Sequence, residues 1–151
     1  MLTIRGTRRA DADAMSALRI ASITTLCAAD HDNDADVLAA WLANKDGAAF
    51  RTMMRDGDSL LLVAEMAGQL VGLGGAAGAR ITLNYVDPAF RFQGVSKAML
   101  AALETVIAAA GFDAATLHST ATALPFYRGQ GWSDAGVGSR LAGYPMCKSL
   151  A

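Results

Sequence analysis

The segment 80–111 restricts the fold more than any other part of the sequence. Its first seven residues alternate polar and apolar side chains, which is the periodicity of a β-strand with one buried face. Asp87 and Pro88 end this strand, and from Val95 onward apolar side chains recur at helical spacing up to a closing glycine. Because 114–118 reads as another strand, the segment predicts a strand–helix–strand crossover between parallel strands.

Further elements surround this unit and predict the fold class. The runs 60–65 and 70–75 are apolar and flank the turn Ala67-Gly68, so they predict a β-hairpin. Asp11 and Asp13 are the candidate N-caps of the first helix. The full predicted order is a strand at 2–5, helices at 13–26, 37–44 and 47–55, strands at 60–65, 70–75 and 80–86, a helix at 95–110, a strand at 114–118, a helix at 121–128 and strands within 132–138 and 142–149. This order predicts an α+β fold with a mixed, mostly antiparallel central sheet and helices on both faces.

Length and charge limit the class of protein. The 151 residues suit a single domain, 1–151, and 53% hydrophobic against 18% charged residues excludes intrinsic disorder. A net charge of −1 gives no basic surface for nucleic acid or for an anionic membrane. No apolar run is long enough for a membrane span or a secretory signal, so we expect a cytoplasmic protein with no nucleic-acid or membrane partner.

The sequence has few cysteine and histidine residues that could bind a metal. Cys27 and Cys147 stand far apart with no CxxC motif, and His31 and His118 are the two histidines. Neither a zinc site nor a disulfide framework has enough residues, so no metal is expected.

Two segments carry candidate chemistry. The helix that starts at Val95 follows a turn with Arg91 and Gly94, and its first backbone N–H groups, together with the helix dipole, favour a phosphate or pyrophosphate. A plain helix start with solvated basic residues is the competing interpretation. In the second segment, 119–132, Tyr127 ends a short helix and is a candidate general acid for a departing thiolate. A core tyrosine with its hydroxyl tied off is the plainer alternative.

Together these segments resemble the GNAT superfamily of acyl-CoA-dependent N-acetyltransferases. The matching residues are Val86-Asp87-Pro88, Arg91-x-x-Gly94-x-Ser96 and Thr120-x-x-Ala123-x-x-Phe126-Tyr127 followed by Gly131-Trp132. The resemblance covers nearly the whole chain in element order. It implies a GNAT-like fold in which two adjacent strands splay apart, and acetyl transfer from acetyl-CoA to an amine by direct attack in a ternary complex.

The resemblance also implies roles for individual residues. The pantetheine arm would pair along the backbone of 83–86, backbone amides of 93–97 would hold the pyrophosphate, and Tyr127 would be the general acid. The oxyanion would be stabilised by a backbone N–H of Tyr85 or Val86. The implied cofactor-binding residues are Leu83, Asn84, Tyr85, Val86, Arg91, Phe92, Gln93, Gly94, Val95, Ser96, Lys97, Thr120 and Phe126.

The sequence departs from the family pattern at two positions and lacks an evident base. Ser96 replaces a Gly or Ala that backbone binding does not require, and Thr120 replaces an Asn that often contacts the cofactor arm. A protonated amine with a pKa near 10.4 is only about one part in 2,500 neutral at pH 7, so a base or a water relay is needed. His118 is the first candidate for that base, and the other candidates are Glu65, Asp30, Asp32 and His31.

Several alternatives stay open at this point. A non-catalytic acyl-CoA-binding sensor or interaction module of the same fold is the main rival to an enzyme. The run 72–77 fits a Gly-x-Gly-x-x-Ala dinucleotide fingerprint, but strand-like residues follow it instead of a helix, which argues against a nucleotide-dependent oxidoreductase. The acceptor is a small-molecule or peptide amine of undefined class. The acidic loop 30–34 would attract a cationic acceptor or simply be solvated, and the Ala-rich helices or final strands could pair in a homodimer.

Overall fold

The computed structural model describes residues 1–26, 34–43 and 46–151. The strands form one seven-stranded sheet in the order β1-β2-β3-β4-β5-β7-β6, with β4 and β5 parallel and the other neighbours antiparallel. This arrangement confirms the predicted mixed, mostly antiparallel sheet. The strands are β1 (Thr3–Gly6), β2 (Leu60–Met66), β3 (Gln69–Ala77), β4 (Arg80–Val86), β5 (Ala114–Ser119), β6 (Ser133–Asp134) and β7 (Tyr144–Ser149).

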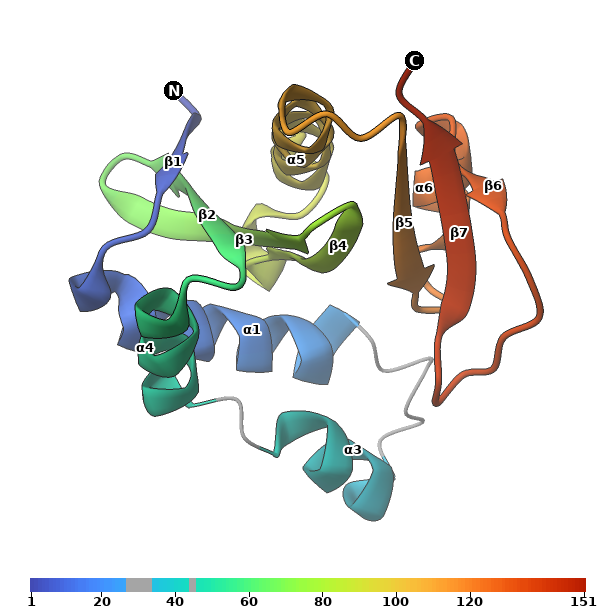
Figure 1. Ribbon diagram of the computed structural model, residues 1–151. Coiled ribbons are helices and arrows are strands. Elements are labelled where there is room, and N and C mark those ends of the chain that lie inside the picture. The colour runs from blue at the N-terminus through green and yellow to red at the C-terminus, as the bar shows by residue number, and fades with distance from the viewer. Residues whose placement is uncertain (27–33, 44–45) are drawn as a thin grey trace.

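Helices cover both faces of the sheet, as predicted (Figure 1). One buried cluster packs α5 against the sheet through Met99 and Leu103, and the other joins Met15 of α1 to Phe50 of α4 on the opposite face. The helices are α1 (Ala12–Leu26), α3 (Ala35–Leu42), α4 (Gly47–Asp56), α5 (Val95–Ala109) and α6 (Leu124–Gly129), with 3-10 turns η1 (Arg9–Asp11) and η2 (Pro88–Phe90). None of the helices in the described part of the chain is long and apolar enough to cross a membrane.

The two strongest local predictions are confirmed. Ala67 and Gly68 form the turn between β2 and β3 with φ of 52° and 77°, the pair of positive values that a two-residue hairpin with the twist of its strands requires. The helix α5 ends at Ala109, and Gly111 follows with φ of 98°, in the left-handed region typical of a C-terminal cap.

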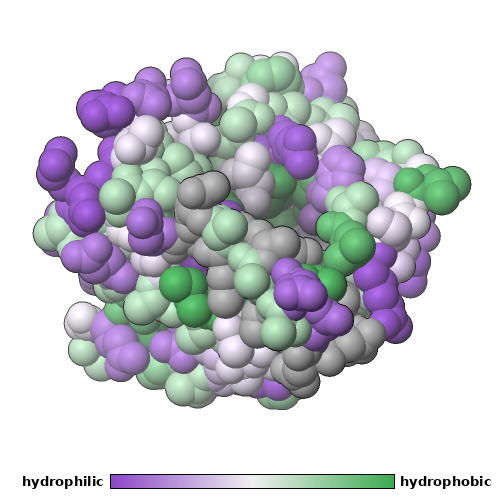
Figure 2. Space-filling model, turned by 90° about the horizontal axis from the view of Figure 1, so that it is seen from below, coloured by the Kyte–Doolittle hydropathy of each residue, from purple (hydrophilic) through white to green (hydrophobic). Residues whose placement is uncertain are grey.

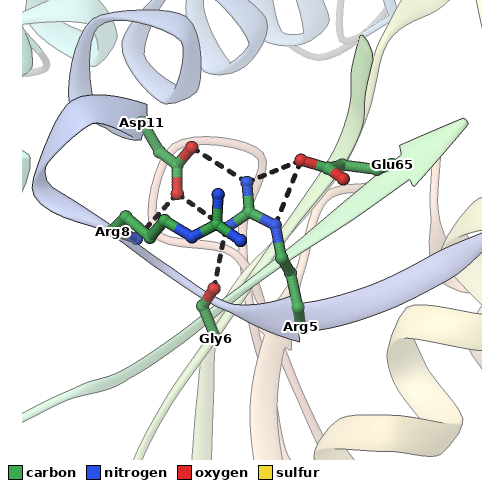
Figure 3. Close-up of polar contacts among 5 residues, drawn as sticks. All are labelled: Arg5, Gly6, Arg8, Asp11 and Glu65. Carbon is green, nitrogen blue, oxygen red and sulfur yellow. Dashed lines mark hydrogen bonds and ion pairs between the residues drawn. The ribbon is translucent and has the colours of Figure 1, made fainter. Parts of the chain in front are cut away.

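The start of the first helix differs from the prediction. Asp11 is not its N-cap: residues 9–11 form a 3-10 turn that runs directly into α1, and the Asp11 carboxylate binds the Arg5 guanidinium at 2.9 Å and the Arg8 backbone N–H at 2.7 Å (Figure 3). Arg5 also pairs with Glu65 at 2.6 Å. A carboxylate this buried is stabilised better by a guanidinium than by backbone N–H groups alone.

The C-terminal elements are shorter than predicted. The helix α6 begins at Leu124 rather than 121, because Pro125 suits the first turn of a helix. Thr120 Oγ1 accepts the backbone N–H of Ala123 at 3.2 Å, so the preceding residues form a turn. Of the predicted strand 132–138 only two residues pair with β7, and a loop then leads to β7 at Tyr144.

The glycines of β3 let α5 approach the sheet closely. A Cβ at Gly72 would lie 2.7 Å from Val95 Cγ1, and one at Gly74 would collide with Met99. Both glycines lie inside a strand, where no helix opens after them, so the dinucleotide interpretation has no structural basis. Their missing side chains are filled by residues of α5 instead.

The strands β4 and β5 diverge soon after they meet (Figure 1). Their register has a single pair, Arg80 with Thr116, at the start of β4. Past this point, the part of the chain that the structure describes leaves the edge of β4 that faces β5 without a strand partner. This divergence is the splay that the sequence resemblance implied.

The face with α1, α3 and α4 presents a mixed surface. In Figure 2 its visible hydrophobic residues form small groups among hydrophilic ones. A homodimer stays a prediction, since such small groups name no single contact surface.

Candidate active site

A cavity of about 370 Å³ lies where β4 and β5 diverge. The elements that line it are α1, β4, the turn before α5, the first turn of α5, the end of β5 and α6. Its lining residues are Ser22, Leu26, Ile81, Thr82, Leu83, Asn84, Tyr85, Val86, Phe90, Arg91, Phe92, Gly94, Val95, Ser96, Lys97, Leu117, His118, Ser119, Thr120, Thr122, Ala123, Phe126 and Tyr127. Every catalytic or cofactor-binding residue that the sequence predicted therefore lines this cavity except Gln93, which is exposed.

The edge of β4 offers backbone groups to this cavity. The Asp87 N–H donates to the Val71 carbonyl at 2.9 Å, so Asp87 faces β3. Because N–H directions alternate along an antiparallel strand, the Tyr85 N–H also faces β3, whereas those of Val86 and Asn84 face the diverging side. Of the two oxyanion donors left open by the sequence, the geometry therefore favours Val86.

The start of α5 is the most polar part of the cavity wall. Gly94 adopts φ of 81° as the N-cap, with open space around its missing Cβ. The first intrahelical hydrogen bond of α5 is donated by the Ala98 N–H to the Gly94 carbonyl at 3.0 Å. The N–H groups of Val95, Ser96 and Lys97 precede that bond and are the unpaired donors of the first turn. With the helix dipole they favour an anion at this position.

The turn before α5 contains a strained and exposed aromatic residue. Phe92 has φ of 65°, a value rare for a bulky residue, and its side chain is 89% exposed. The Arg91 guanidinium lies over its ring, with Cζ 4.2 Å from the ring centroid. Burial does not account for this conformation, and both residues line the cavity mouth.

Tyr127 is buried at the inner end of the cavity. Its ring packs edge-on against Phe126 and Trp132, with centroids 5.1 and 6.1 Å away. Its hydroxyl accepts a long hydrogen bond of 3.4 Å from Asn84 Nδ2. Burial raises the pKa of Tyr127 to about 12, although the Asn84 hydrogen bond opposes that rise. The phenol is therefore protonated at neutral pH and, with Asn84 as its donor, has its own proton free for another acceptor.

Asn84 carries the second unusual polar atom of the cavity. Its Oδ1 is buried and has no hydrogen-bond partner in the described part of the chain. A buried acceptor that has lost water lowers stability unless some donor reaches it. Because Asn84 lines the cavity, a water or a bound molecule with an N–H or O–H group could supply that donor.

The candidate bases are separated by the structure. His118 is exposed and lines the cavity, at the end of β5. Glu65 instead pairs with Arg5, between β1 and β2 (Figure 3). It is not among the residues that line the cavity. Asp30, His31 and Asp32, with most of the acidic loop, lie outside the described residues, and Asp34 of that loop caps α3. His118 is thus the candidate with a described position at the cavity.

Two lining residues of α1 were not identified as site residues from sequence. Ser22 and Leu26 recur at helical spacing with Met15 and Leu18, a pattern that indicates a packed helix face rather than a site. The polar Ser22 on an otherwise apolar face is the signal that could have drawn attention to them. The Asn84 side chain was likewise missed as a partner of Tyr127, since 43 residues separate the two.

Comparison with known proteins connects this geometry to a family. The family described as "Acetyltransferase (GNAT) domain" matches residues 27–148. A GCN5-related N-acetyltransferase from Rhodopseudomonas palustris is 28% identical, with a TM-score of 0.85 over 97% of this chain and 94% of that one. The PaiA N-acetyltransferase of Thermoplasma acidophilum, solved in complex with coenzyme A, is 16% identical with a TM-score of 0.86 over 99% of both chains.

A solved structure with a lower TM-score also matches nearly the whole chain. An aminoglycoside 6'-acetyltransferase type Ii is 17% identical, with a TM-score of 0.70 over 99% of this chain and 97% of that one. No curated protein matches the chain by sequence. The seven-stranded mixed sheet with helices on both faces is the fold that these solved acetyltransferases share.

Proposed function

Because the chain belongs to the GNAT family of acetyltransferases, we propose that it transfers an acetyl group from acetyl-CoA to a primary amine by direct attack in a ternary complex. The observation that carries this proposal is the cavity itself. It combines an unpaired strand edge, an uncapped helix start and a buried phenol within one space between β4 and β5. Those are the groups that a thioester with a phosphorylated carrier would need.

The residues present fit acetyl-CoA as the acetyl donor. The unpaired N–H groups of Val95, Ser96 and Lys97 suit a pyrophosphate, and Gly94 leaves room for its close approach. The amide-containing pantetheine arm suits the edge of β4 and the Oδ1 of Asn84, neither of which has a partner among the described residues. The coenzyme A complex of the related PaiA protein supports the same choice of donor.

The Thr120 substitution bears on one of these contacts. Its hydroxyl oxygen already accepts the Ala123 N–H, which leaves one donor and one further lone pair for a ligand. The family's Asn at this position would offer a longer side chain. We therefore assign Thr120 mainly to the turn before α6, and the contact to the cofactor arm is expected to be weaker than in relatives that keep Asn.

The attack requires a neutral amine and a stabilised oxyanion. The amine nitrogen forms a bond to the thioester carbon, and the carbonyl oxygen gains negative charge near the Val86 N–H. His118 is the proposed proton acceptor for the attacking amine, directly or through a water. When the tetrahedral intermediate collapses, the C–S bond breaks and the amide remains.

Tyr127 is proposed to act on the departing sulfur. A thiol has a pKa of about 8.5, so full transfer of a proton from a phenol of pKa about 12 is uphill by about 5 kcal/mol. We therefore expect Tyr127 to donate a strong hydrogen bond to the developing thiolate. The thiol receives its proton in the end from the amine by way of the base and solvent, which balances the reaction.

A non-catalytic acyl-CoA sensor is the second candidate. The observation that favours it is that no carboxylate lines the cavity within the described residues, which leaves His118 alone as a base. Isothermal titration with acetyl-CoA, followed by thiol-release assays on a panel of amines, separates the two. Turnover on any amine supports the enzyme, binding without turnover supports the sensor, and no binding refutes both.

A further inference from the structure

Arg19 is a half-buried cation with no counter-ion among the described residues. It lies on α1, and its guanidinium Cζ lies 5.4 Å from the ring centroid of Phe50 and 5.8 Å from that of Tyr85. Within residues 1–26, 34–43 and 46–151, no carboxylate pairs with Arg19, and its Nε is buried without a hydrogen-bond partner. Two rings therefore hold the guanidinium, while its Nε–H makes no hydrogen bond to the described residues.

An unpaired donor of this kind is not explained by packing. The two rings attract the positive charge but do not accept its N–H groups in their plane. A methionine would pack its chain against the same rings without leaving a buried donor unsatisfied. Nε is buried without a hydrogen-bond partner among the described residues, and the residue as a whole is half-buried. The planar fork that the terminal nitrogens form with Nε matches a carboxylate.

The position of Arg19 relates it to the active-site cavity. Arg19 is not itself a lining residue, but two of its neighbours are. Ser22 lies one turn further along the same face of α1, and the Arg19 guanidinium lies over the ring of Tyr85. Arg91 and Lys97 line the cavity at the start of α5. Arg19 is thus placed behind the α1 side of the cavity wall, and the Tyr85 ring is its nearest link to the cavity.

The charges around the cavity favour an anionic group on the acceptor. Its charged or titratable lining includes Arg91, Lys97 and His118, and no Asp or Glu lines it in the part of the chain that the structure describes. An acceptor with several ammonium groups would find no carboxylate there. An acceptor with one amine and one carboxylate would bring a counter-ion that no described residue supplies to Arg19.

We propose that the acceptor is a small amine that also carries a carboxylate, and that Arg19 binds this carboxylate. The inference rests on the proposed acetyl transfer and adds the class of its second substrate. A free amino acid and a short peptide share this chemistry. Arg19 acts on the acceptor by an ion pair with two parallel N–H donors, while the amine points toward the thioester.

The test compares acceptors that differ only in the carboxylate. Amino acids, the corresponding amino acid amides, dipeptides and an aliphatic diamine are assayed by thiol release with the wild type, Arg19→Met, Arg19→Lys and Arg80→Met. Arg80→Met is the matched control, because Arg80 is exposed at the far end of β4 and outside the cavity. Melting temperatures verify that each variant is folded.

We expect kcat/KM of the wild type to be about 10- to 100-fold higher for the carboxylate-bearing amine than for its amide, the range of a hydrogen bond between charged groups. Arg19→Met should abolish this preference while leaving the rate with the amide within about twofold. Arg19→Lys should retain part of the preference for the carboxylate. Arg80→Met should keep the full wild-type preference. Free amino acids and dipeptides distinguish which source of the carboxylate is used.

Two results would overturn the inference: equal or better rates with the amide or the diamine, or a carboxylate preference that survives Arg19→Met. If no amine is acetylated, calorimetry on the coenzyme A complex decides. If an N-acetyl amino acid binds the wild type at least tenfold more tightly than it binds Arg19→Met, the proposed acceptor class is supported even though acetyl transfer has failed. Equal affinity for the two proteins, or no binding to either, refutes the proposed acceptor class. Acetylation of amides without any dependence on Arg19 leaves the transfer reaction standing and removes only the inference.

Discussion

Replacing Tyr127 with phenylalanine removes one oxygen from the active-site cavity and little else. The ring keeps its edge contacts with Phe126 and Trp132, and the hydroxyl gives up a single hydrogen bond of 3.4 Å from Asn84. A long hydrogen bond of this kind contributes at most about 1 kcal/mol, so the free energy of unfolding should change by no more than that. Because the variant cannot donate a hydrogen bond to the developing thiolate, turnover should fall by about 10²- to 10³-fold.

The assay combines three measurements on Tyr127→Phe and on Tyr144→Phe. Tyr144 lies on β7 outside the cavity lining, so its variant controls for loss of a phenol. Calorimetric affinity for acetyl-CoA should match the wild type in both variants. Thiol release should drop only for Tyr127→Phe, and kcat should fall more than KM changes.

The pH dependence adds an independent check. Since burial holds the pKa of Tyr127 near 12, its ionisation should cause no loss of wild-type rate below about pH 11. Unchanged turnover in Tyr127→Phe would refute the role of the phenol. A wild-type alkaline limb near pH 10 that disappears in the variant would refute the account of its environment.

Further predictions concern the helix start, the Arg5 cluster and the packing of β3. In Gly94→Ala the added Cβ meets no atom, but the residue must keep φ of 81°, so the free energy of unfolding should fall by about 1–2 kcal/mol while the affinity for acetyl-CoA changes little. Gly94→Glu places a negative charge at the helix start and should weaken acetyl-CoA binding, measured by calorimetry, by tenfold or more. Normal affinity in Gly94→Glu would mean that the pyrophosphate binds elsewhere. The Arg5 hydrogen bond lowers the pKa of Asp11, so the ion pair stabilises the fold above the unfolded pKa of 3.8, and this stabilisation is lost as pH falls through the folded pKa. The acid-induced loss of stability, followed by circular dichroism, should therefore be shallower in Asp11→Asn than in the wild type. Identical profiles for the two proteins would contradict a stabilising ion pair. Gly74→Ala should lower the melting temperature by roughly 2–10 °C because its Cβ collides with the fully buried Met99, and an unchanged value would show that α5 can shift freely.

Local signals in the sequence were sufficient for most of the fold. The turn at Ala67 and Gly68 and the boundaries of α5 were predicted because glycine and hydrophobic periodicity act within a few residues. The parallel pairing of β4 with β5 was predicted because a helix separates them. The late start of α6 could also have been read from Pro125, which prefers the first turn of a helix.

Features that depend on long-range packing could not be predicted. The sequence offered Asp11 as a helix cap, and only the fold brings it to Arg5, which also binds Glu65 from a strand 60 residues away. The same holds for the contact of Asn84 with Tyr127. The environment of Arg19 likewise depends on α1 lying against β4, because only the fold places its guanidinium over Tyr85 and leaves its Nε without a partner among the described residues.

The glycines of β3 restrict how this protein could be made more stable. Replacing glycine in a strand interior is a common choice in stability engineering, because glycine packs poorly there and lowers strand propensity. At Gly72 and Gly74 that choice would push on Val95 and Met99, the residues by which α5 rests on the sheet. Val95 is also the first residue of the helix start that is proposed to bind pyrophosphate. A methyl group added at Gly72 would therefore displace this helix start and weaken the binding of acetyl-CoA. Variant libraries that aim at higher melting temperature should therefore keep both positions fixed.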